Sequence, residues 1–389
     1  MNVVNQTAHQ AEHVGRPNTL LQINHLSVDY HAENGTVHAL TDVSLSLERG
    51  RILGLAGESG SGKSTLGYAV TRLLKPPAAI VAGEALYTPR AARLTGELAQ
   101  PVDVLRLTPQ QLRALRWTEL AIVFQSAMNA LNPVLNVGAQ LTDVLRAHRP
   151  DMTRQQRQAR ALELLRMVGI APDRLRSFPH ELSGGMRQRA IIAIALALAP
   201  DLIIMDEPTT ALDVVVQREI LMEVMALRAE LAFSVVFITH DLSLLLELAD
   251  TVAIMYAGRV VELATRGELK RNPRHPYSYG MLNSFPTIQG ERRHMTGIPG
   301  SPPDLRSVAP GCAFAARCPL AFAACRTETP PLLPATGPGD SQLVACHLYD
   351  PRHRAAAPTA AEFAARYEAA YRQERTPGRT PGRMERSAR

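Results

Sequence analysis

Residues 57–64 read Gly-Glu-Ser-Gly-Ser-Gly-Lys-Ser and match the pattern G-x-x-x-x-G-K-[ST]. The apolar run at 52–56 just before them predicts a buried strand, and apolar residues from Leu66 to Leu74 recur at helical spacing. A strand, a glycine loop and a helix in this order open a parallel α/β unit. The free N–H groups of such a loop and the positive end of the helix dipole form a cradle for phosphate oxygens. We therefore expect an α/β protein that binds a nucleotide at this loop.

The loop residues are expected to have different roles in binding phosphate and Mg²⁺. Lys63 would reach the β- and γ-phosphates, and Ser64 would ligate Mg²⁺. A glycine-rich turn without a ligand is the alternative, but a chance match is expected only about once in a thousand such chains. The other predicted phosphate-binding positions are Gly57, Ser59, Gly60, Ser61, Gly62 and Thr65.

A second strand predicts the acidic side of the same site. Residues 202–205 are apolar and end in Asp206 and Glu207. A parallel sheet places such carboxylates beside the phosphate loop, where Asp206 suits Mg²⁺, directly or through water. Glu207 would orient or deprotonate the attacking water. A solvated strand end is the alternative for this pair taken alone.

The remaining periodicity extends the α/β pattern in both directions. Residues 21–30 and 39–47 alternate like the strands of a hairpin, and further strands are expected at 234–239 and within 251–261. Helical spacing at 154–169 and 184–199 predicts helices, so about 129–181 reads as a helical insertion.

The motif LSGGMRQR at 182–189 lies between the glycine-rich loop at 57–64 and the strand that ends in Asp206 and Glu207. With it, the chain resembles the nucleotide-binding subunit of an ATP-binding cassette (ABC) transporter. The family motif more often ends in Gln where this chain has Met186, but the Ser and Gly donors are intact. The family's landmarks occur in the same order here: Tyr30, the loop at 57–64, Gln125, LSGGM, Asp206-Glu207, Ala211-Leu212-Asp213 and His240.

The resemblance assigns a part to each landmark. Tyr30 would stack on adenine, although an exposed strand tyrosine is the alternative. Gln125 would contact Mg²⁺ and the attacking water, and His240 would contact the γ-phosphate. Ser183, Gly184 and Gly185 open a helix, so they would form an anion site for the γ-phosphate bound by a partner subunit, and Asp213 would also lie at the nucleotide.

The resemblance covers about residues 20–350 and implies the P-loop NTPase fold of an ABC ATPase domain. That fold combines an antiparallel β subdomain, a parallel α/β core and a helical subdomain. The implied mechanism is that two cassettes clamp two ATP molecules and part after hydrolysis. The implied partners are a second ABC ATPase subunit, two transmembrane permease subunits and an extracytoplasmic peptide-binding protein. The chain would then act at the cytoplasmic face of the cell membrane.

Four stretches resemble one branch, the first ATPase subunit of dipeptide, oligopeptide and nickel importers. Besides LSGGMRQR, they are NPRHPY at 272–277, IPGSPP at 298–303 and GCAFAARCP at 311–319. We therefore expect the chain to energise peptide uptake, with nickel or another small solute as the alternative cargo.

All four cysteines, Cys312, Cys318, Cys325 and Cys346, lie in a proline-rich, irregular extension. A reducing cytoplasm disfavours disulfides, and thiolates in a segment with little core of its own suit a metal centre. The spacing lacks the short C-x₂-C knuckles of zinc sites, and similar importer ATPases are reported to carry a [4Fe–4S] cluster. An iron–sulfur cluster is the favoured interpretation, with Zn²⁺ and free thiols as alternatives.

Charge separates the end of the chain from the rest. The formal net charge is +6, but residues 351–389 hold nine arginines against four glutamates, which leaves the remainder near neutral. We therefore expect no nucleic acid partner. The predicted organisation is a flexible leader at 1–19, the ATPase domain at 20–270, the cysteine-bearing extension at 271–350 and an Arg-rich, partly disordered tail at 351–389. An alanine-rich helix in this tail is expected to be a solvated surface element.

Two other classes share parts of this pattern. Cassette ATPases that act on nucleic acid, the ribosome or iron–sulfur assembly usually have two cassettes, a coiled-coil insertion or a shorter chain, whereas this chain has one phosphate loop and no heptad array. A small-molecule kinase would use the phosphate loop but does not need LSGGM.

Overall fold

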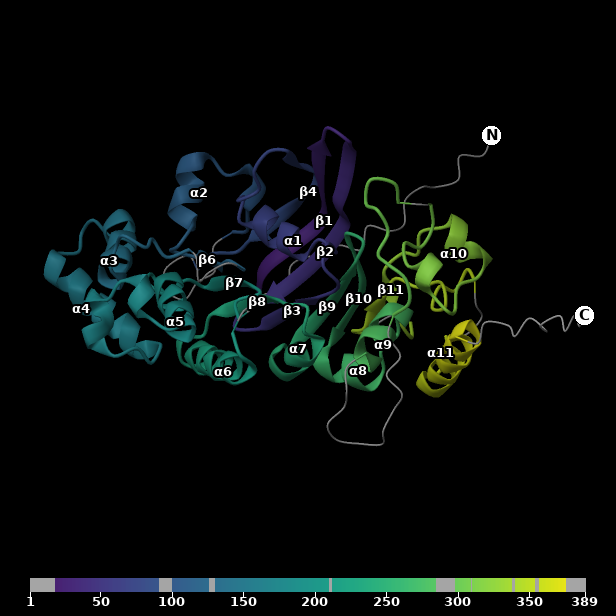
Figure 1. Cartoon of the computed structure of the whole chain (residues 1–389). Coiled ribbons are helices and arrows are strands. Elements are labelled where there is room, and N and C mark those ends of the chain that lie inside the picture. The colour runs from purple at the N-terminus through teal and green to yellow at the C-terminus, as the bar shows by residue number, and fades with distance from the viewer. Residues whose placement is uncertain are drawn as a thin grey trace, which may run out of the picture. The chain divides into compact units, whose positions relative to one another are not determined.

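The computed structural model describes residues 18–90, 100–125, 130–209, 212–284, 298–308, 310–337, 340–353 and 357–375 (Figure 1). Most of the predicted leader, the end of the tail and Ala211 lie outside these ranges. The chain forms two compact units. The first comprises Met1–His31, Leu40–Leu53 and Ser64–Ile238, and the second comprises Ala32–Ala39, Gly54–Lys63 and Thr239–Arg389.

An antiparallel sheet in the first unit follows from strands with one buried and one exposed face. Its strand order is β2-β1-β4-β5. In β1, Leu21, Ile23, Leu26 and Val28 are buried while residues between them are more exposed, which is the alternation that predicted a hairpin. The strands are β1 (Thr19–Ala32), β2 (Gly35–Glu48), β4 (Ala78–Tyr87) and β5 (Val102–Asp103).

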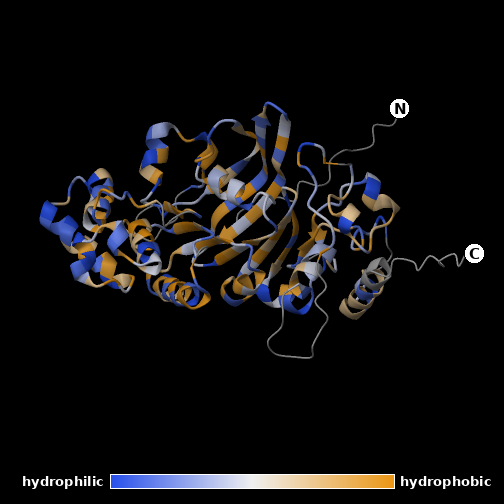
Figure 2. Ribbon diagram, in the orientation of Figure 1, coloured by the Kyte–Doolittle hydropathy of each residue, from blue (hydrophilic) through white to orange (hydrophobic). Residues whose placement is uncertain are grey.

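Parallel strands in the same unit carry the acidic motif. In register, β6 pairs with β7 and β7 pairs with β8, both in parallel. Every residue of β7 and β8 is buried, because a parallel sheet is covered on both faces. Figure 2 shows these strands largely in the colours of hydrophobic residues. The strands are β6 (Leu120–Val123), β7 (Leu202–Asp206) and β8 (Ser234–Ile238), and β3 (Ile52–Ala56) is equally buried.

Several helices of the first unit begin at side-chain caps. Thr153 caps α4 because its side chain accepts from the N–H of Gln156. The Gln156 side chain accepts in turn from the Thr153 N–H, which completes a capping box. Asn136 caps α3 in the same position. The helices are α1 (Lys63–Val70), α2 (Pro109–Leu115), α3 (Val137–His148), α4 (Arg154–Met167), α5 (Gly184–Ala195) and α6 (Val214–Leu231). Short 3₁₀ turns are η1 (Val104–Arg106), η3 (Pro172–Arg176) and η4 (Pro179–Glu181).

The second unit contains an antiparallel arrangement of strands in the order β11-β12-β10-β9. The region 251–261, where a strand or two was expected, is a hairpin that turns at Ala257 and Gly258, both with positive φ. Its strands are β9 (Thr251–Tyr256), β10 (Arg259–Thr265), β11 (Leu333–Pro334) and β12 (Leu343–Val344). Its helices are α7 (Leu242–Leu248), α8 (Arg266–Arg271), α9 (Pro276–Asn283), η5 (Ala315–Arg317), α10 (Ala323–Thr327) and α11 (Ala360–Arg375).

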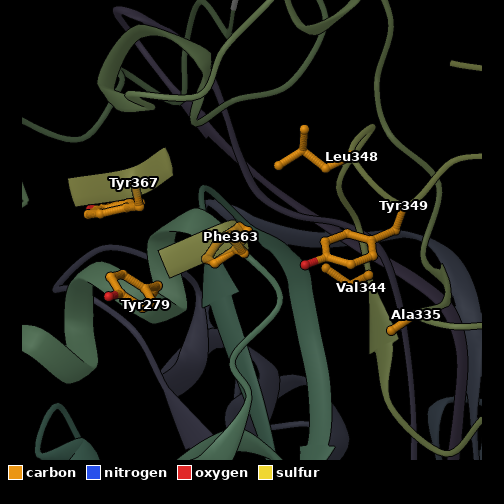
Figure 3. Packing of buried hydrophobic residues seen from close by; sticks show 7 residues of the cluster. All are labelled: Tyr279, Ala335, Val344, Leu348, Tyr349, Phe363 and Tyr367. Atoms are coloured by element: carbon orange, nitrogen blue, oxygen red, sulfur yellow. The ribbon is translucent and has the colours of Figure 1, made fainter. Parts of the chain in front are cut away.

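The expectation of a solvated C-terminal helix was wrong. In α11, Phe363 is 2% exposed and Tyr367 is fully buried. Both rings pack on Tyr279 of α9 (Figure 3). The centroid of the Tyr279 ring lies 5.5 Å from that of Phe363 and 4.7 Å from that of Tyr367. Phe363 and Tyr367 are four residues apart and share one helix face. The extension and α11 therefore build a small core of their own, which also contains Val344, Leu348 and Tyr349.

Within the part of the chain that the structure describes, no helix is long and apolar enough to cross a membrane.

Candidate functional site

The phosphate loop of the second unit closes around Lys63. The Lys63 ammonium donates to the carbonyl oxygens of Gly57 and Glu58, each at 2.8 Å, and lies 3.3 Å from the Ser61 hydroxyl. At Gly57, φ is +153° and an added Cβ would lie 2.2 Å from the Met255 carbonyl oxygen, so only glycine fits. Gly60 and Gly62 also have positive φ, whereas Ser59 is exposed at the rim of the loop. The loop therefore holds an ammonium group within a glycine-rich turn, where a phosphate can meet it.

In the first unit, Ser64 contacts the carboxylate at the end of β7. Its hydroxyl, in the first turn of α1, donates to Asp206 Oδ1 at 2.9 Å, and Asp206 at the end of β7 is fully buried. A hydroxyl and a carboxylate are the oxygen ligands that Mg²⁺ prefers. The two side chains expected to hold Mg²⁺ are thus neighbours and fit the ion.

One turn further along α1, Tyr68 is a neighbour of Asp206 that the sequence did not predict. Burial and the Asp206 carboxylate raise the pKa of Tyr68 to about 12, so its phenol keeps its proton. The Tyr68 ring lies against Phe124, with centroids 5.9 Å apart. Phe124 precedes Gln125, so the ring contact joins α1 to the segment that carries this glutamine. A tyrosine at this position carries no motif of its own, and no signal in the sequence identified it.

Glu207 and Gln125 meet side chain to side chain. Gln125 Nε2 donates to Glu207 Oε2 at 2.7 Å, and the Glu207 N–H donates to the Ile238 carbonyl at 2.9 Å. Glu207 has φ +45°, a left-handed conformation that costs a non-glycine residue about 1–2 kcal/mol. Such strain often occurs where function fixes the direction of a side chain. A carboxylate that accepts from an amide and is half-exposed can hold a water molecule as a general base.

Tyr30, in β1, lies beside the start of α1. Its phenol oxygen is 3.4 Å from the Thr65 hydroxyl, and the side chain is half-buried. The structure therefore places an aromatic ring beside the first turn of α1, next to a predicted phosphate-binding residue.

The LSGGM motif forms the beginning of α5. Ser183 is its N-cap and accepts from the Met186 N–H at 3.3 Å, while Gly184 and Gly185 form the first turn. A Cβ on Gly185 would lie 2.8 Å from the Val216 side chain of α6. Asp213 caps that helix through the Val216 N–H at 3.0 Å. The motif thus presents an exposed serine and free helix N–H groups, which together suit an anion.

His240 belongs to the second unit, where it is exposed between β8 and α7. The residues on either side of it are joined, since the Asp241 N–H donates to the Thr239 hydroxyl at 3.1 Å. Its contact with a γ-phosphate stays a prediction.

The four cysteines come together in the second unit. Cys312, Cys318, Cys325 and Cys346 line one pocket, and none forms a disulfide. The pocket is otherwise mostly apolar, with Phe314, Leu320 and Leu348 among its lining residues. Burial raises the pKa of Cys312 to about 11 and that of Cys346 well above its ordinary value. These two thiols therefore keep their protons unless a metal replaces them. Four sulfurs around one apolar pocket fit a cluster.

Arg317, between two of these cysteines, binds the phosphate loop. Its guanidinium donates to both carboxylate oxygens of Glu58, at 2.7 and 2.9 Å. Sequence reasoning missed this pair because Glu58 occupies a variable position of the loop motif. The only local signal was a basic side chain in the otherwise apolar run GCAFAARCP.

Two family models match the chain. A model described as ABC transporter matches residues 40–210, and one described as the C-terminal region of oligopeptide/dipeptide transporters matches residues 261–325. The oligopeptide transport ATP-binding protein OppD of Bacillus subtilis is 40% identical over 82% of this chain and 86% of its own length. The dipeptide transport ATP-binding protein DppD of Lactococcus lactis is 39% identical over 87% of this chain and 94% of its own.

Among solved structures, the ATP-binding cassette MJ0796 in a dimeric post-hydrolysis state with ADP and phosphate is similar. It superimposes with a TM-score of 0.54 at 27% identity, over 64% of this chain and 99% of that chain.

Proposed function

Because the chain belongs to the ABC transporter family, among its oligopeptide and dipeptide transport ATP-binding proteins, we propose that it hydrolyses ATP to drive peptide uptake. The observation that carries the catalytic part is the pair of contacts at the end of β7. Ser64 meets Asp206 at 2.9 Å, and Gln125 meets Glu207 at 2.7 Å. The end of β7 therefore carries two neighbouring carboxylates. Asp206 pairs with Ser64 as a proposed ligand set for magnesium, and Glu207 is the proposed base, oriented by the Gln125 amide.

Each residue then has one task in hydrolysis. Loop N–H groups and Lys63 bind the phosphates. Ser64 and Asp206 would hold Mg²⁺, which would neutralise charge on the phosphate oxygens. Glu207 accepts a proton from the attacking water, and Gln125 keeps the carboxylate turned toward it. Tyr30 stacks on the adenine, which its place beside Thr65 supports.

The second half of the site is proposed to come from a partner cassette. Ser183, Gly184 and Gly185 would bind the γ-phosphate held by the partner, while Asp213 and His240 complete the interface. Two observations support this arrangement. The helix N-terminus at Ser183 is exposed, and the similar cassette MJ0796 is a dimer with ADP and phosphate bound.

The wider assembly follows from the family. The chain would pair with a second ABC ATPase subunit and dock on two transmembrane permeases at the cytoplasmic face of the membrane, with an extracytoplasmic peptide-binding protein delivering the cargo. We propose the ATPase domain at residues 20–270 and the peptide-transporter extension at 271–350, which the match at 261–325 supports.

The cysteine pocket is proposed to hold a [4Fe–4S] cluster with a structural part. Four thiols around one apolar pocket, in a segment poor in regular structure, support a metal centre that adds to the small core of the extension. Anaerobically purified protein should show broad absorption near 400 nm, which Cys318→Ser should abolish. Colourless protein with one zinc per chain would refute the cluster and favour Zn²⁺.

Transport itself is tested with the complete assembly. The chain is copurified with its permeases and second ATPase, reconstituted into vesicles, and supplied with the binding protein. Uptake of labelled dipeptides, oligopeptides and Ni²⁺ is then measured with and without ATP. ATP-dependent peptide uptake is expected, whereas uptake of Ni²⁺ alone would assign the same ATPase to another cargo.

A further inference from the structure

Glu58, inside the phosphate loop, is held from a segment 259 residues away in the sequence. Arg317 Nη1 donates to Glu58 Oε2 at 2.7 Å and Arg317 Nη2 donates to Oε1 at 2.9 Å. The arginine side chain is 7% exposed and the glutamate side chain 29%. A two-pronged pair of this kind fixes the orientation of the carboxylate as well as its position.

Arg317 is itself rigidly held. Its Nε donates to the Pro299 carbonyl at 2.7 Å, and Nη1 also donates to the Tyr256 hydroxyl at 3.2 Å. The guanidinium lies over the rings of Tyr256 and Phe314, 5.7 and 5.9 Å from their centroids. Although burial lowers the pKa of Arg317, the hydrogen bonds to Glu58 and Tyr256 raise it, so the cation is retained. This side chain is therefore a fixed anchor rather than a mobile surface arginine.

The backbone of Glu58 is held as well. Its N–H donates to the Tyr277 hydroxyl at 2.8 Å, and its carbonyl accepts from the Lys63 ammonium at 2.8 Å. Anchoring Glu58 therefore fixes one of the carbonyl groups that position Lys63, the residue expected to reach the phosphates.

One ring that contacts the Arg317 guanidinium also lines the cysteine pocket. Phe314 is a lining residue of that pocket, and its ring contacts the ring of Tyr277 with centroids 5.4 Å apart. Arg317 directly precedes Cys318, and its N–H donates to the Phe314 carbonyl at 3.0 Å. A change in the fold of residues 312–318 would thus move the groups that hold Glu58.

We propose that Arg317 is a positioning residue for nucleotide binding, which keeps the phosphate loop in its binding shape and makes that shape depend on an ordered cysteine segment. Arg317 acts through Glu58 and Lys63 rather than by touching the nucleotide. The dependence on the cysteine segment rests on the proposed metal centre, whereas the action of Arg317 on the loop does not.

The first experiment measures ATP affinity of the full-length chain with a fluorescent ATP analogue. Arg317→Gln and Glu58→Gln should each weaken binding about tenfold, and the double variant should bind no more weakly than either single variant. Arg317→Lys should bind ATP with intermediate affinity, because an ammonium keeps the positive charge but cannot make the two parallel hydrogen bonds to the Glu58 carboxylate. The maximal hydrolysis rate at saturating ATP should change less than KM.

The matched control is a second shielded arginine pair. Arg49 and Asp201 are 2.8 Å apart, with side chains 10% and 14% exposed. Arg49→Gln should lower the melting temperature and leave ATP affinity unchanged. Wild-type affinity in both Arg317→Gln and Glu58→Gln would overturn the proposal, as would an equal loss in Arg49→Gln. If Arg317→Gln does not fold, Glu58→Gln supplies the same comparison from the more exposed side of the pair.

The second experiment tests the dependence on the cysteines by measuring iron content and ATP affinity together. Cys318→Ser should lose iron and bind ATP as weakly as Arg317→Gln, while Arg317→Gln should keep its iron. A Cys318→Ser protein that loses iron and binds ATP like the wild type would overturn this dependence. Iron-free wild-type protein would refute the proposed cluster, but the comparison of Arg317→Gln with the wild type would remain decisive for the loop.

Discussion

At the scale of single residues, Glu207 shows how the backbone prepares a side chain for chemistry. Its left-handed conformation is compensated by an N–H bond to Ile238, and its carboxylate is held by Gln125. The preceding residue, Asp206, is buried and bonded to Ser64. Two adjacent carboxylates thus differ in surroundings: Asp206, the proposed metal ligand, is enclosed, whereas Glu207, the proposed base, is half-exposed.

Replacement of Glu207 separates binding from hydrolysis. Glu207→Gln keeps the size of the side chain but cannot accept a proton, so turnover should fall about 10²- to 10⁴-fold while ATP binding persists. Hydrolysis is measured on the assembled ATPase subunits, and binding with a fluorescent ATP analogue. Glu230→Gln, an exposed change on α6, should leave both unchanged. Near-normal hydrolysis by Glu207→Gln would show that another group is the base.

At the scale of elements, helix caps serve both stability and binding. Thr153 and Ser183 each cap a helix of the first unit. The side chain of each accepts a hydrogen bond from the N–H of the residue three positions later. Only Ser183 belongs to the LSGGM motif. The two positions therefore allow the structural cost of losing a cap to be separated from a functional one.

Removal of these caps gives a paired prediction. Ser183→Ala and Thr153→Ala should each lower the free energy of unfolding by about 1 kcal/mol, because each leaves an N–H of the first helical turn without its side-chain acceptor. Only Ser183→Ala should also reduce ATP hydrolysis. Urea unfolding and steady-state hydrolysis check the two parts. Equal hydrolysis in both variants would indicate that Ser183 is a cap and nothing more.

The attachment of α11 is the second prediction at this scale. Phe363→Ala removes a buried ring from the cluster with Tyr279 and Tyr367, at a cost of about 3–5 kcal/mol. We expect fast amide exchange in α11, measured by hydrogen exchange with mass spectrometry. Arg366→Ala, on the exposed face of the same helix, should leave the exchange slow. Unchanged protection in Phe363→Ala would mean that other contacts hold the helix.

At the scale of the whole molecule, what the sequence predicts depends on how local the signal is. The loop at 57–64, the strand ending in Asp206 and the capped helix at Ser183 each carry their pattern within a few residues, and the structure contains all three elements. The four-residue strand β6 is too short for a periodic signal. The burial of α11 depends on a partner surface on α9, which its own sequence does not reveal.

Contacts between distant parts of the chain are the second feature that the sequence does not predict. Nothing in the loop motif distinguishes Glu58 from other variable residues, and only the fold brings Arg317 to it. The interpretation of the four cysteines as a metal centre requires that the thiols gather, and they do line one pocket. Local chemistry can therefore be predicted from the sequence, but the link between the extension and the phosphate loop requires the structure.

Coupled hydrolysis and uptake in reconstituted vesicles tests the central claim most directly. ATP hydrolysis and uptake of a labelled dipeptide are followed together, with wild-type chain or with Glu207→Gln as the single altered subunit. We expect peptide to stimulate hydrolysis in the wild type, and uptake to fall together with hydrolysis in the variant. Undiminished dipeptide uptake with Glu207→Gln would contradict the claim that this chain's ATP hydrolysis drives transport.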